Sequence, residues 1–251
     1  MTDKVVCITG SGVRIGAHLA DVLHHNGWRI ILHGRHSIDV AQQHADRLNA
    51  IRLDSVCVVQ GDLLDTAALT HLAQDISQCF GRLDALIHNA SSFFSTPMGQ
   101  ATLQDWDDLM GSNARAPFFL TQALLPILRQ SKGVVLSMID IHANGQPFAD
   151  YPIYNMAKAA HRMMVQALAN DLAPEIRVNG ISPGANLWPD DGSISALDAE
   201  VQSRVMASIP MQRVGTPDDL AAAVCYLLDA SYVTGQILAV DGGRSLTIAG
   251  E

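Results

Sequence analysis

Two side chains in the segment YNMAK are suited to proton transfer. Tyr154 and Lys158 are four residues apart, so on a helix they share one face. A phenol with its ordinary pKa of about 10 is a poor acid or base at neutral pH, but a cation about 4 Å away lowers that pKa by up to about 3 units. We therefore interpret the pair as an acid–base catalyst. A half-buried helical tyrosine beside a lysine that reaches solvent is the alternative.

A carboxylic acid lies near the end of the strand that precedes this helix. In the run VVLSMIDIHANG, Ser137 lies within the expected strand and Asp140 follows it, fourteen residues before Tyr154. A carboxylate opposes the alkoxide that develops when a carbonyl is reduced, but beside a C=N bond it favours the protonated nitrogen that accepts hydride best. Asp140 therefore indicates an imine-type substrate, although it could instead cap backbone amides in an Asx turn.

A glycine-rich segment, ITGSGVRIG, lies close to the start of the chain. It follows an apolar run and precedes a helical pattern, and in that context glycines let backbone N–H groups approach a phosphate. The spacing Thr9-Gly10-x-x-x-Arg14-x-Gly16 departs from the six-residue G-x-G-x-x-G pattern and includes a long cation, Arg14. We interpret it as a dinucleotide-binding loop, with a plain turn between strand and helix as the alternative.

The end of the second expected strand, LHGRHS, predicts which dinucleotide binds. In dinucleotide-binding folds an acidic residue at this point bonds to the ribose 2′-hydroxyl of NAD and repels a 2′-phosphate. This chain has no acid there and instead carries Arg35, with His36 and Ser37 beside it. The sequence therefore favours NADP(H) as the cofactor.

Seven β-rich runs alternate with segments of helical character and must position these residues. The runs are KVVCIT, RIILH, SVCVVQ, DALIH, GVVLSMI, IRVNGI and QILAV. The alternation predicts an α/β protein: one Rossmann-fold domain over residues 1–251, with a doubly wound, seven-stranded parallel sheet and helices on both faces. Residues 183–197, rich in Pro, Gly and acids, are expected to form a mobile substrate loop.

The helix boundaries can also be predicted from the sequence. Asn26 and Gly27 are expected to end the first helix, and Thr66, Thr102 and Thr216 are candidate N-caps.

Composition excludes several classes of protein. The chain is 48% hydrophobic and has a formal net charge of -9, with no cluster of basic residues, which argues against binding to nucleic acid or to an anionic membrane. Four cysteines without C-x-x-C spacing predict reduced, buried thiols, and ten scattered histidines favour no metal site. No apolar run approaches the roughly 20 residues that span a bilayer, and no signal peptide is recognised, so we expect a cytoplasmic protein.

Together the motifs resemble the short-chain dehydrogenase/reductases over nearly the whole chain. They include the glycine loop, GDLLD, HNAS, Asn113, YNMAK, SPG and VTGQ with VDGG. The resemblance implies that Asn113 holds a water linking Lys158 to solvent, that Lys158 binds the nicotinamide ribose, and that Asp62 contacts adenine. The cofactor-binding residues that we predict are Gly10, Gly12, Arg14, Ile15, Gly16, Arg35, His36, Ser37, Asp62, Asn89, Ala90, Ser91, Tyr154, Lys158, Pro183 and Gly184.

Within that family, Arg14, the run NASSFF, Asp140 before PIYNMAK and the ending VDGGRSLT resemble the pteridine reductases. The resemblance implies NADPH-dependent reduction of a dihydropterin or dihydrofolate by a homotetramer. Phe93 would stack on the pterin ring, Arg14 and Ser91 would contact its polar edge and the cofactor phosphate, and Asp140 and Tyr154 would relay the proton. Reduction of a ketone or other carbonyl, and NADPH sensing without catalysis, are the alternative functions.

The chain departs from the pteridine reductase pattern at one point and from the pattern of the wider family at another. Asp140 lies one residue farther from Tyr154 than in that pattern, so a bulge is expected near Asn144 and Gly145. His88 stands where the wider family commonly has Asn.

Overall fold

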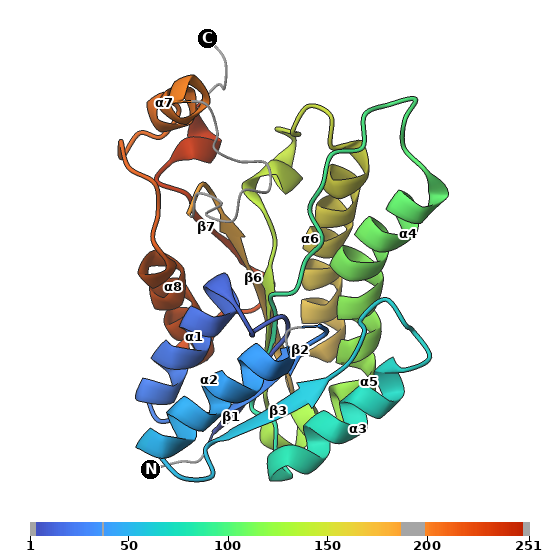
Figure 1. Ribbon diagram of the computed structural model, residues 1–251, viewed down its shortest axis with the longest axis vertical. Coiled ribbons are helices and arrows are strands. Elements are labelled where there is room, and N and C mark those ends of the chain that lie inside the picture. Colours follow the sequence, from blue (N-terminus) through green and yellow to red (C-terminus); the bar gives the residue numbers. More distant parts are fainter. Residues whose placement is uncertain (1–3, 37, 187–198, 248–251) are drawn as a thin grey trace.

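A seven-stranded parallel sheet with the order β3-β2-β1-β4-β5-β6-β7 runs through the middle of the molecule (Figure 1). The computed structural model describes residues 4–36, 38–186 and 199–247. The strands are β1 (Val5–Ile8), β2 (Arg29–Gly34), β3 (Val56–Gln60), β4 (Ala85–His88), β5 (Val134–Met138), β6 (Arg177–Pro183) and β7 (Ile237–Val240). Each lies within or overlaps one of the predicted runs, so the predicted Rossmann-like fold is confirmed.

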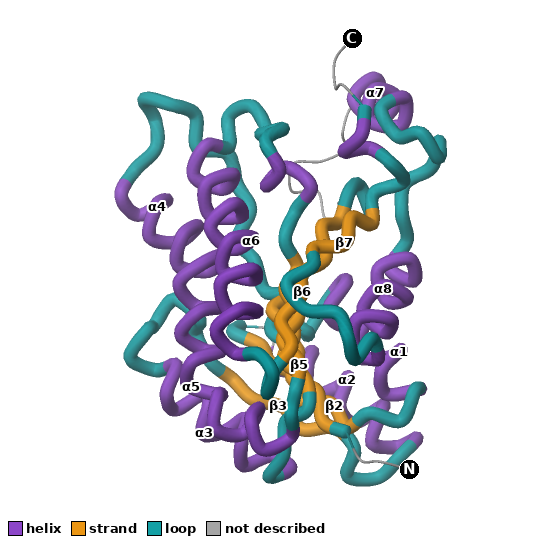
Figure 2. Tube along the Cα trace, turned by 180° about the vertical axis from the view of Figure 1, so that it is seen from behind, coloured by secondary structure: helices purple, strands orange, loops and turns teal. Residues whose placement is uncertain are grey.

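Helices cover both faces of this sheet (Figure 2). They are α1 (Arg14–His25), α2 (Ile38–Ile51), α3 (Leu69–Phe80), α4 (Leu103–Met110), α5 (Ala116–Ser131), α6 (Pro152–Leu172), α7 (Ala199–Ala207) and α8 (Pro217–Asp229). One apolar cluster joins α1, α2 and α8 to one face, and a second joins α3, α5 and α6 to the other. The strands are apolar on both faces because both are covered.

The predicted helix boundaries are confirmed at three of four positions. Asn26 caps the C-terminus of α1, while Thr102 and Thr216 each form a capping box with the aspartate three residues later. Thr66 was wrongly predicted as an N-cap, because α3 begins only at Leu69. The Asp65 side chain instead accepts the N–H groups of the two residues that precede this helix, at 3.0 and 3.2 Å.

The expectation of reduced cysteines is wrong for two of the four. Cys57 on β3 and Cys79 near the end of α3 form a disulfide. Because α3 packs across β3, it brings the two Cα atoms to 6.1 Å, which is within bonding range. Cys7 and Cys225 are free thiols, and burial raises the pKa of Cys7 to about 12.

The order in which strands are added to the sheet reverses at β1. The strands β2 and β3 lie on one side of β1, and β4 pairs with its other side. In open α/β sheets ligands bind at such a switch point, beyond the carboxyl ends of the strands. The segments that follow β1, β2, β4 and β5 contain most of the predicted site residues, so the topology gathers them at one edge.

The described residues form neither a membrane-spanning helix nor a cluster of metal ligands. None of its helices is both long and apolar enough to cross a bilayer. Among the described residues, no three His, Cys, Asp or Glu side chains gather where they could hold a metal ion.

Because His33 and His88 are buried, we expect acid to destabilise the protein. Burial lowers the pKa of His33 to about 4 and that of His88 to about 3. In the unfolded chain both rings titrate near pH 6.5, so they favour the fold above that pH and lose this contribution as the pH falls toward 4 and 3. At about pH 5 each ring should lower the free energy of unfolding by about 2 kcal/mol.

Urea unfolding of the wild type and of His88→Gln at pH 7 and pH 5 measures this effect. The loss of stability between the two pH values should be about 2 kcal/mol smaller in the variant. An equal loss in both proteins would contradict the assignment.

Candidate active site

Two of the predicted catalytic residues, Asp140 and Tyr154, lie together at the carboxyl end of β5. Tyr154 lies in the first turn of α6, and its hydroxyl donates a hydrogen bond to Asp140 Oδ2 at 2.8 Å. The other carboxylate oxygen, Oδ1, accepts the backbone N–H of His142 at 2.8 Å. Asp140 therefore caps a turn, as the Asx-turn alternative expected, and the same side chain also faces Tyr154.

The extra residue between Asp140 and Tyr154 is accommodated in a short 3₁₀ turn. This turn, Ile141–Asn144, begins just after Asp140 and ends at Gly145, whose φ of 96° is in the left-handed region that favours glycine. This turn and Gly145 lie where the sequence predicts a bulge. It returns the chain to α6 with Tyr154 still pointing at Asp140.

The electrostatic environment of Tyr154 differs from the prediction. Its pKa is raised, first because the phenol is buried and second because the Asp140 carboxylate faces it. Lys158 Nζ lies 5.7 Å from the Tyr154 ring centroid and donates to the Met138 carbonyl at 2.9 Å, so the expected lowering of the phenol pKa by Lys158 is wrong for this arrangement. Burial also lowers the pKa of Lys158 to about 8, against the effect of Asp140. Tyr154 therefore keeps its proton at neutral pH, and in this arrangement it is a weaker acid than a free phenol.

Asn113 is a buried anchor for the segment after β4. It lies in a π-helical turn, Gly111–Arg115, an irregularity that is frequent at functional sites. Its amide donates to the carbonyls of Ser92 and Leu109 at 2.9 and 3.0 Å, and its Oδ1 accepts the Ser91 hydroxyl at 2.6 Å. The side chain therefore links α4 to the loop that carries Ser91.

The glycine loop packs tightly against the end of β4. Gly10 has a φ of 63°, and a Cβ atom there would lie 2.9 Å from Ala90 Cα. A Cβ at Gly16 would lie 2.6 Å from the Gly10 oxygen and 2.7 Å from the Asn89 amide nitrogen. That amide donates to the carbonyls of Thr9 and Gly10, both at 3.0 Å. Asn89 and Ala90 thus support the loop, and glycine is required for the close approach.

The start of α1 fits a bound pyrophosphate. Val13 is the N-cap, and within the described part of the chain no side chain caps this end and no acid lies in the first turn. The first N–H groups of a helix lack internal partners and carry a partial positive charge, which favours an anion. The residues present are therefore compatible with a dinucleotide.

The predicted 2′-phosphate contact, Arg35, is exposed and forms an ion pair with Asp62 at 3.0 Å. The pair joins the end of β2 to the segment after β3. His36 is also exposed, and Ser37 lies outside the described residues. The structure thus brings together the residue predicted to contact the 2′-phosphate, Arg35, and the residue predicted to contact adenine, Asp62.

Phe93 and Phe94 have different environments. Phe94 is partly buried and packs beside Leu109 and Ile153. Phe93 is 47% exposed, and its ring stacks on Tyr151 with centroids 4.7 Å apart and meets Tyr154 edge-on at 4.8 Å. Phe93 therefore presents an aromatic surface next to the proton donor.

The end of β6 completes the predicted cofactor residues. Gly184 donates its N–H to the Val240 carbonyl at 3.0 Å, and a Cβ atom there would lie 2.7 Å from Asp241 Cβ, so this segment is held against the end of β7. Of the substrate loop predicted at 183–197, residues 183–186 are described, and 187–197 lie outside the described residues.

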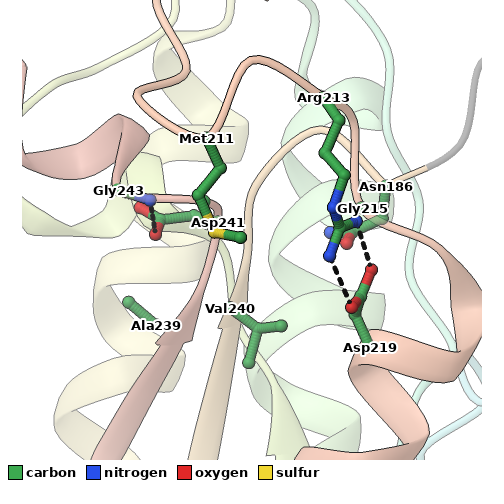
Figure 3. A pocket seen from close by; sticks show the side chains of 10 residues that line it. Asn186, Met211, Arg213, Gly215, Asp219, Ala239, Val240, Asp241 and Gly243 are labelled. Carbon is green, nitrogen blue, oxygen red and sulfur yellow. Dashed lines mark hydrogen bonds and ion pairs between the residues drawn. The ribbon is translucent and has the colours of Figure 1, made fainter.

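A cavity of about 380 Å³ at the carboxyl end of β7 is a separate feature (Figure 3). Asn186, Met211 and the ion pair of Arg213 with Asp219, at 2.8 Å, contribute to its lining. It contains none of the predicted catalytic or substrate residues.

A family model described as enoyl-(acyl carrier protein) reductase matches residues 12–245 of the chain. The chain belongs to the short-chain dehydrogenase/reductase family. It is 33% identical to pteridine reductase 1 of Leishmania tarentolae, over 99% of this chain and 98% of that protein. It is 31% identical to a putative ketoacyl reductase 2 of the granaticin polyketide synthase from Streptomyces violaceoruber, over 96% of each chain. It is also 30% identical to a probable 2,4-dienoyl-CoA reductase of Bacillus subtilis, over 98% of each.

Membership of this family makes the chain an oxidoreductase with a nicotinamide cofactor, NAD(H) or NADP(H). The names of the three relatives specify different substrates, so the family alone does not choose among them.

Sequence reasoning missed one charged neighbour of the catalytic residues. Arg244, which follows the VDGG motif, is partly buried and donates through Nε to Ser208 Oγ at 3.1 Å. Burial lowers the pKa of its guanidinium, whereas Asp140 and Asp241 raise it. A cation from the C-terminal segment of the short-chain reductase therefore acts on Asp140, and its position directly after VDGG was the signal available in the sequence.

Replacing Arg14 is expected to affect the stability of the protein and its catalytic activity in different ways. It is exposed and has a φ of 55°, a left-handed conformation that costs a non-glycine residue about 1 to 2 kcal/mol. Arg14→Gly removes this cost and should leave the melting temperature of the reductase equal or higher. Loss of the guanidinium should nevertheless lower kcat/KM by about tenfold or more.

Thermal unfolding and cofactor oxidation by the same preparation test both effects. Arg14→Asn, which tolerates the same backbone conformation without a charge, should share the catalytic loss. Wild-type turnover in both variants would exclude a role for Arg14 at the site.

Proposed function

We propose that this short-chain reductase is an NADPH-dependent pteridine reductase. It reduces a dihydropterin, such as dihydrobiopterin or dihydromonapterin, or dihydrofolate, to the tetrahydro form. The observation that carries the proposal is the 2.8 Å hydrogen bond from the Tyr154 hydroxyl to Asp140. It puts a proton donor and a carboxylate at one point, which is the arrangement that reduction of a C=N bond needs.

When bound, the nicotinamide supplies a hydride to the carbon of the C=N bond. Tyr154 holds a proton at neutral pH and donates it to the adjacent ring nitrogen, so that hydride and proton together reduce the C=N bond. The Asp140 carboxylate, held by the backbone N–H of His142, stabilises the nitrogen as it becomes positively charged. Burial around Tyr154 strengthens both interactions because it excludes water.

The aromatic surface supports a flat heterocyclic substrate. Phe93 is half-exposed and is held from one side by Tyr151, so it can stack on a pterin at little cost in side-chain order. Such stacking contributes about 0.5 to 1.5 kcal/mol beyond the burial of area. The 33% identity with a pteridine reductase over nearly the full length supports the same substrate class.

Reduction of a ketone or other carbonyl is the second candidate function. It is favoured by the 31% identity with a putative ketoacyl reductase. It requires a donor to the carbonyl oxygen, whereas the side chain that faces Tyr154 is the carboxylate of Asp140. Oxidation of NADPH with dihydropterins, dihydrofolate and simple ketones side by side separates the two functions, and turnover of ketones alone would reject the pterin proposal.

Removing the carboxylate tests its role directly. Asp140→Asn keeps an oxygen that can accept the His142 N–H but loses the charge, so it should lower kcat for dihydropterin by about 100-fold or more while the Kd for NADPH is unchanged. Asp140→Ser should behave alike on pterins. Asp150→Asn, which removes an exposed carboxylate from the same loop, is the control and should keep full activity. Unchanged turnover by Asp140→Asn would reject the role of Asp140.

The cofactor preference depends on Arg35. With no acid at the end of β2 and Arg35 exposed there, the enzyme should prefer NADPH to NADH, and Arg35→Ala should reduce that preference about tenfold by raising the KM for NADPH alone. Arg47→Ala, at an exposed arginine paired with Asp21, is the control. Equal use of NADPH and NADH by the wild type would contradict the proposed specificity.

We also propose that the enzyme is a homotetramer. The edge strand β7 exposes Leu238, and the neighbouring α8 exposes Tyr226, at 39% and 58%. These apolar side chains support contacts through the final strand and the last helices.

A further inference from the structure

A buried histidine lies directly beneath the glycine loop. His33, near the end of β2, is 2% exposed, and its Nδ1 accepts the backbone N–H of Gly10 at 3.2 Å. On the other side of the ring, Nε2 donates to the Gly61 carbonyl at 3.1 Å. Because an amide N–H only donates and a carbonyl only accepts, the ring is neutral and carries its proton on Nε2.

The main chain of the same residue also contacts the loop. Ser11 donates its backbone N–H to the His33 carbonyl, and the His33 N–H returns a bond to the Ser11 hydroxyl, both at 3.0 Å. Three hydrogen bonds therefore join His33 to Gly10 and Ser11, the first two loop residues after Thr9.

We propose that His33 is a positioning residue for the dinucleotide, setting the conformation of the glycine loop through the bond from its Nδ1 to the Gly10 N–H. Gly10 stands at the point where β1 turns into the loop, with a φ of 63°. Its carbonyl is held by Asn89 and its N–H by His33, so the peptide units on both sides of this residue are constrained. A loop with one of these bonds missing has more conformations, and cofactor binding must then select one of them.

The second bond of the ring extends this effect to the adenosine end of the site. Gly61 directly precedes Asp62, the partner of Arg35 in the ion pair. One ring thus connects the carboxyl ends of β1, β2 and β3, the strands whose following segments contain the predicted phosphate and adenosine contacts. Burial lowers the pKa of His33 to about 4, against a smaller opposing effect of Asp62, so the required neutral form persists at neutral pH.

The two hydrogen bonds can be separated by substitution. Asn places an oxygen near the position of Nδ1 and can still accept the Gly10 N–H, whereas Gln reaches toward the position of Nε2 and can still donate to Gly61. Leu removes both bonds while filling similar space. His24→Leu is the matched control, because His24 is also a buried histidine, bonded to Ser55 at 2.8 Å at the far end of α1.

Binding of NADPH and of 2′,5′-ADP, measured by calorimetry, is the first readout. His33→Leu should raise both Kd values about tenfold or more, His33→Asn should recover most of the loss, and His33→Gln should recover little of it. His24→Leu should lower stability toward urea and leave both Kd values unchanged. A wild-type Kd in His33→Leu, an equal loss in His24→Leu, or rescue by Gln and not by Asn would overturn the proposal.

Two measurements on the wild-type protein without cofactor test the role of His33 even if His33→Leu fails to fold. Nitrogen NMR should find the His33 ring as the neutral tautomer protonated on Nε2, and hydrogen exchange should find the Gly10 amide protected. A ring protonated on Nδ1, or a Gly10 amide that exchanges freely, would overturn the proposal. Neither these measurements nor the binding of NADPH and 2′,5′-ADP involves a pterin, so failure to reduce pterins would leave them unaffected.

Discussion

The glycine loop and the residues after β4 are so closely packed that neither Gly10 nor Gly16 has room for a Cβ atom. This contact holds the start of α1 against the segment after β4, and β1 and β4 are the strands between which the order of the sheet reverses. It also orders the partners of the loop, because the Asn89 amide must reach two of its carbonyls and the Ala90 backbone must lie against it. The rest of the site lies around this contact between the segments that follow β1 and β4.

At the candidate site, the carboxylate of Asp140 lies among hydrogen-bond donors and cations. Asp140 accepts from Tyr154 and from the His142 backbone, and its charge opposes the lowering of the pKa of Lys158 and of Arg244 that burial causes. Such an arrangement suits a substrate atom that gains positive charge and disfavours one that becomes an alkoxide. The relatives, which are named as reductases of different substrates, leave the choice to this local chemistry.

Much of the fold could be predicted from the sequence because its signals are local. Seven apolar runs with intervening helical patterns specified the sheet, and the capping boxes at Thr102 and Thr216 needed only a side chain and the aspartate three residues later. The glycine loop, YNMAK and Asp140 were likewise recognisable as short segments. Thr66 failed because α3 begins only at Leu69, after a turn in which the Asp65 side chain accepts the backbone N–H groups.

The sequence by itself determined the order of the elements and the chemical types available at the end of each strand. Only the tertiary structure decided which of these side chains meet. The disulfide of Cys57 with Cys79, the raised pKa of Tyr154 and the position of His33 between Gly10 and Gly61 all depend on contacts between separate elements. Burial and the distance between charges set these properties, and both arise only once the helices have packed on the sheet.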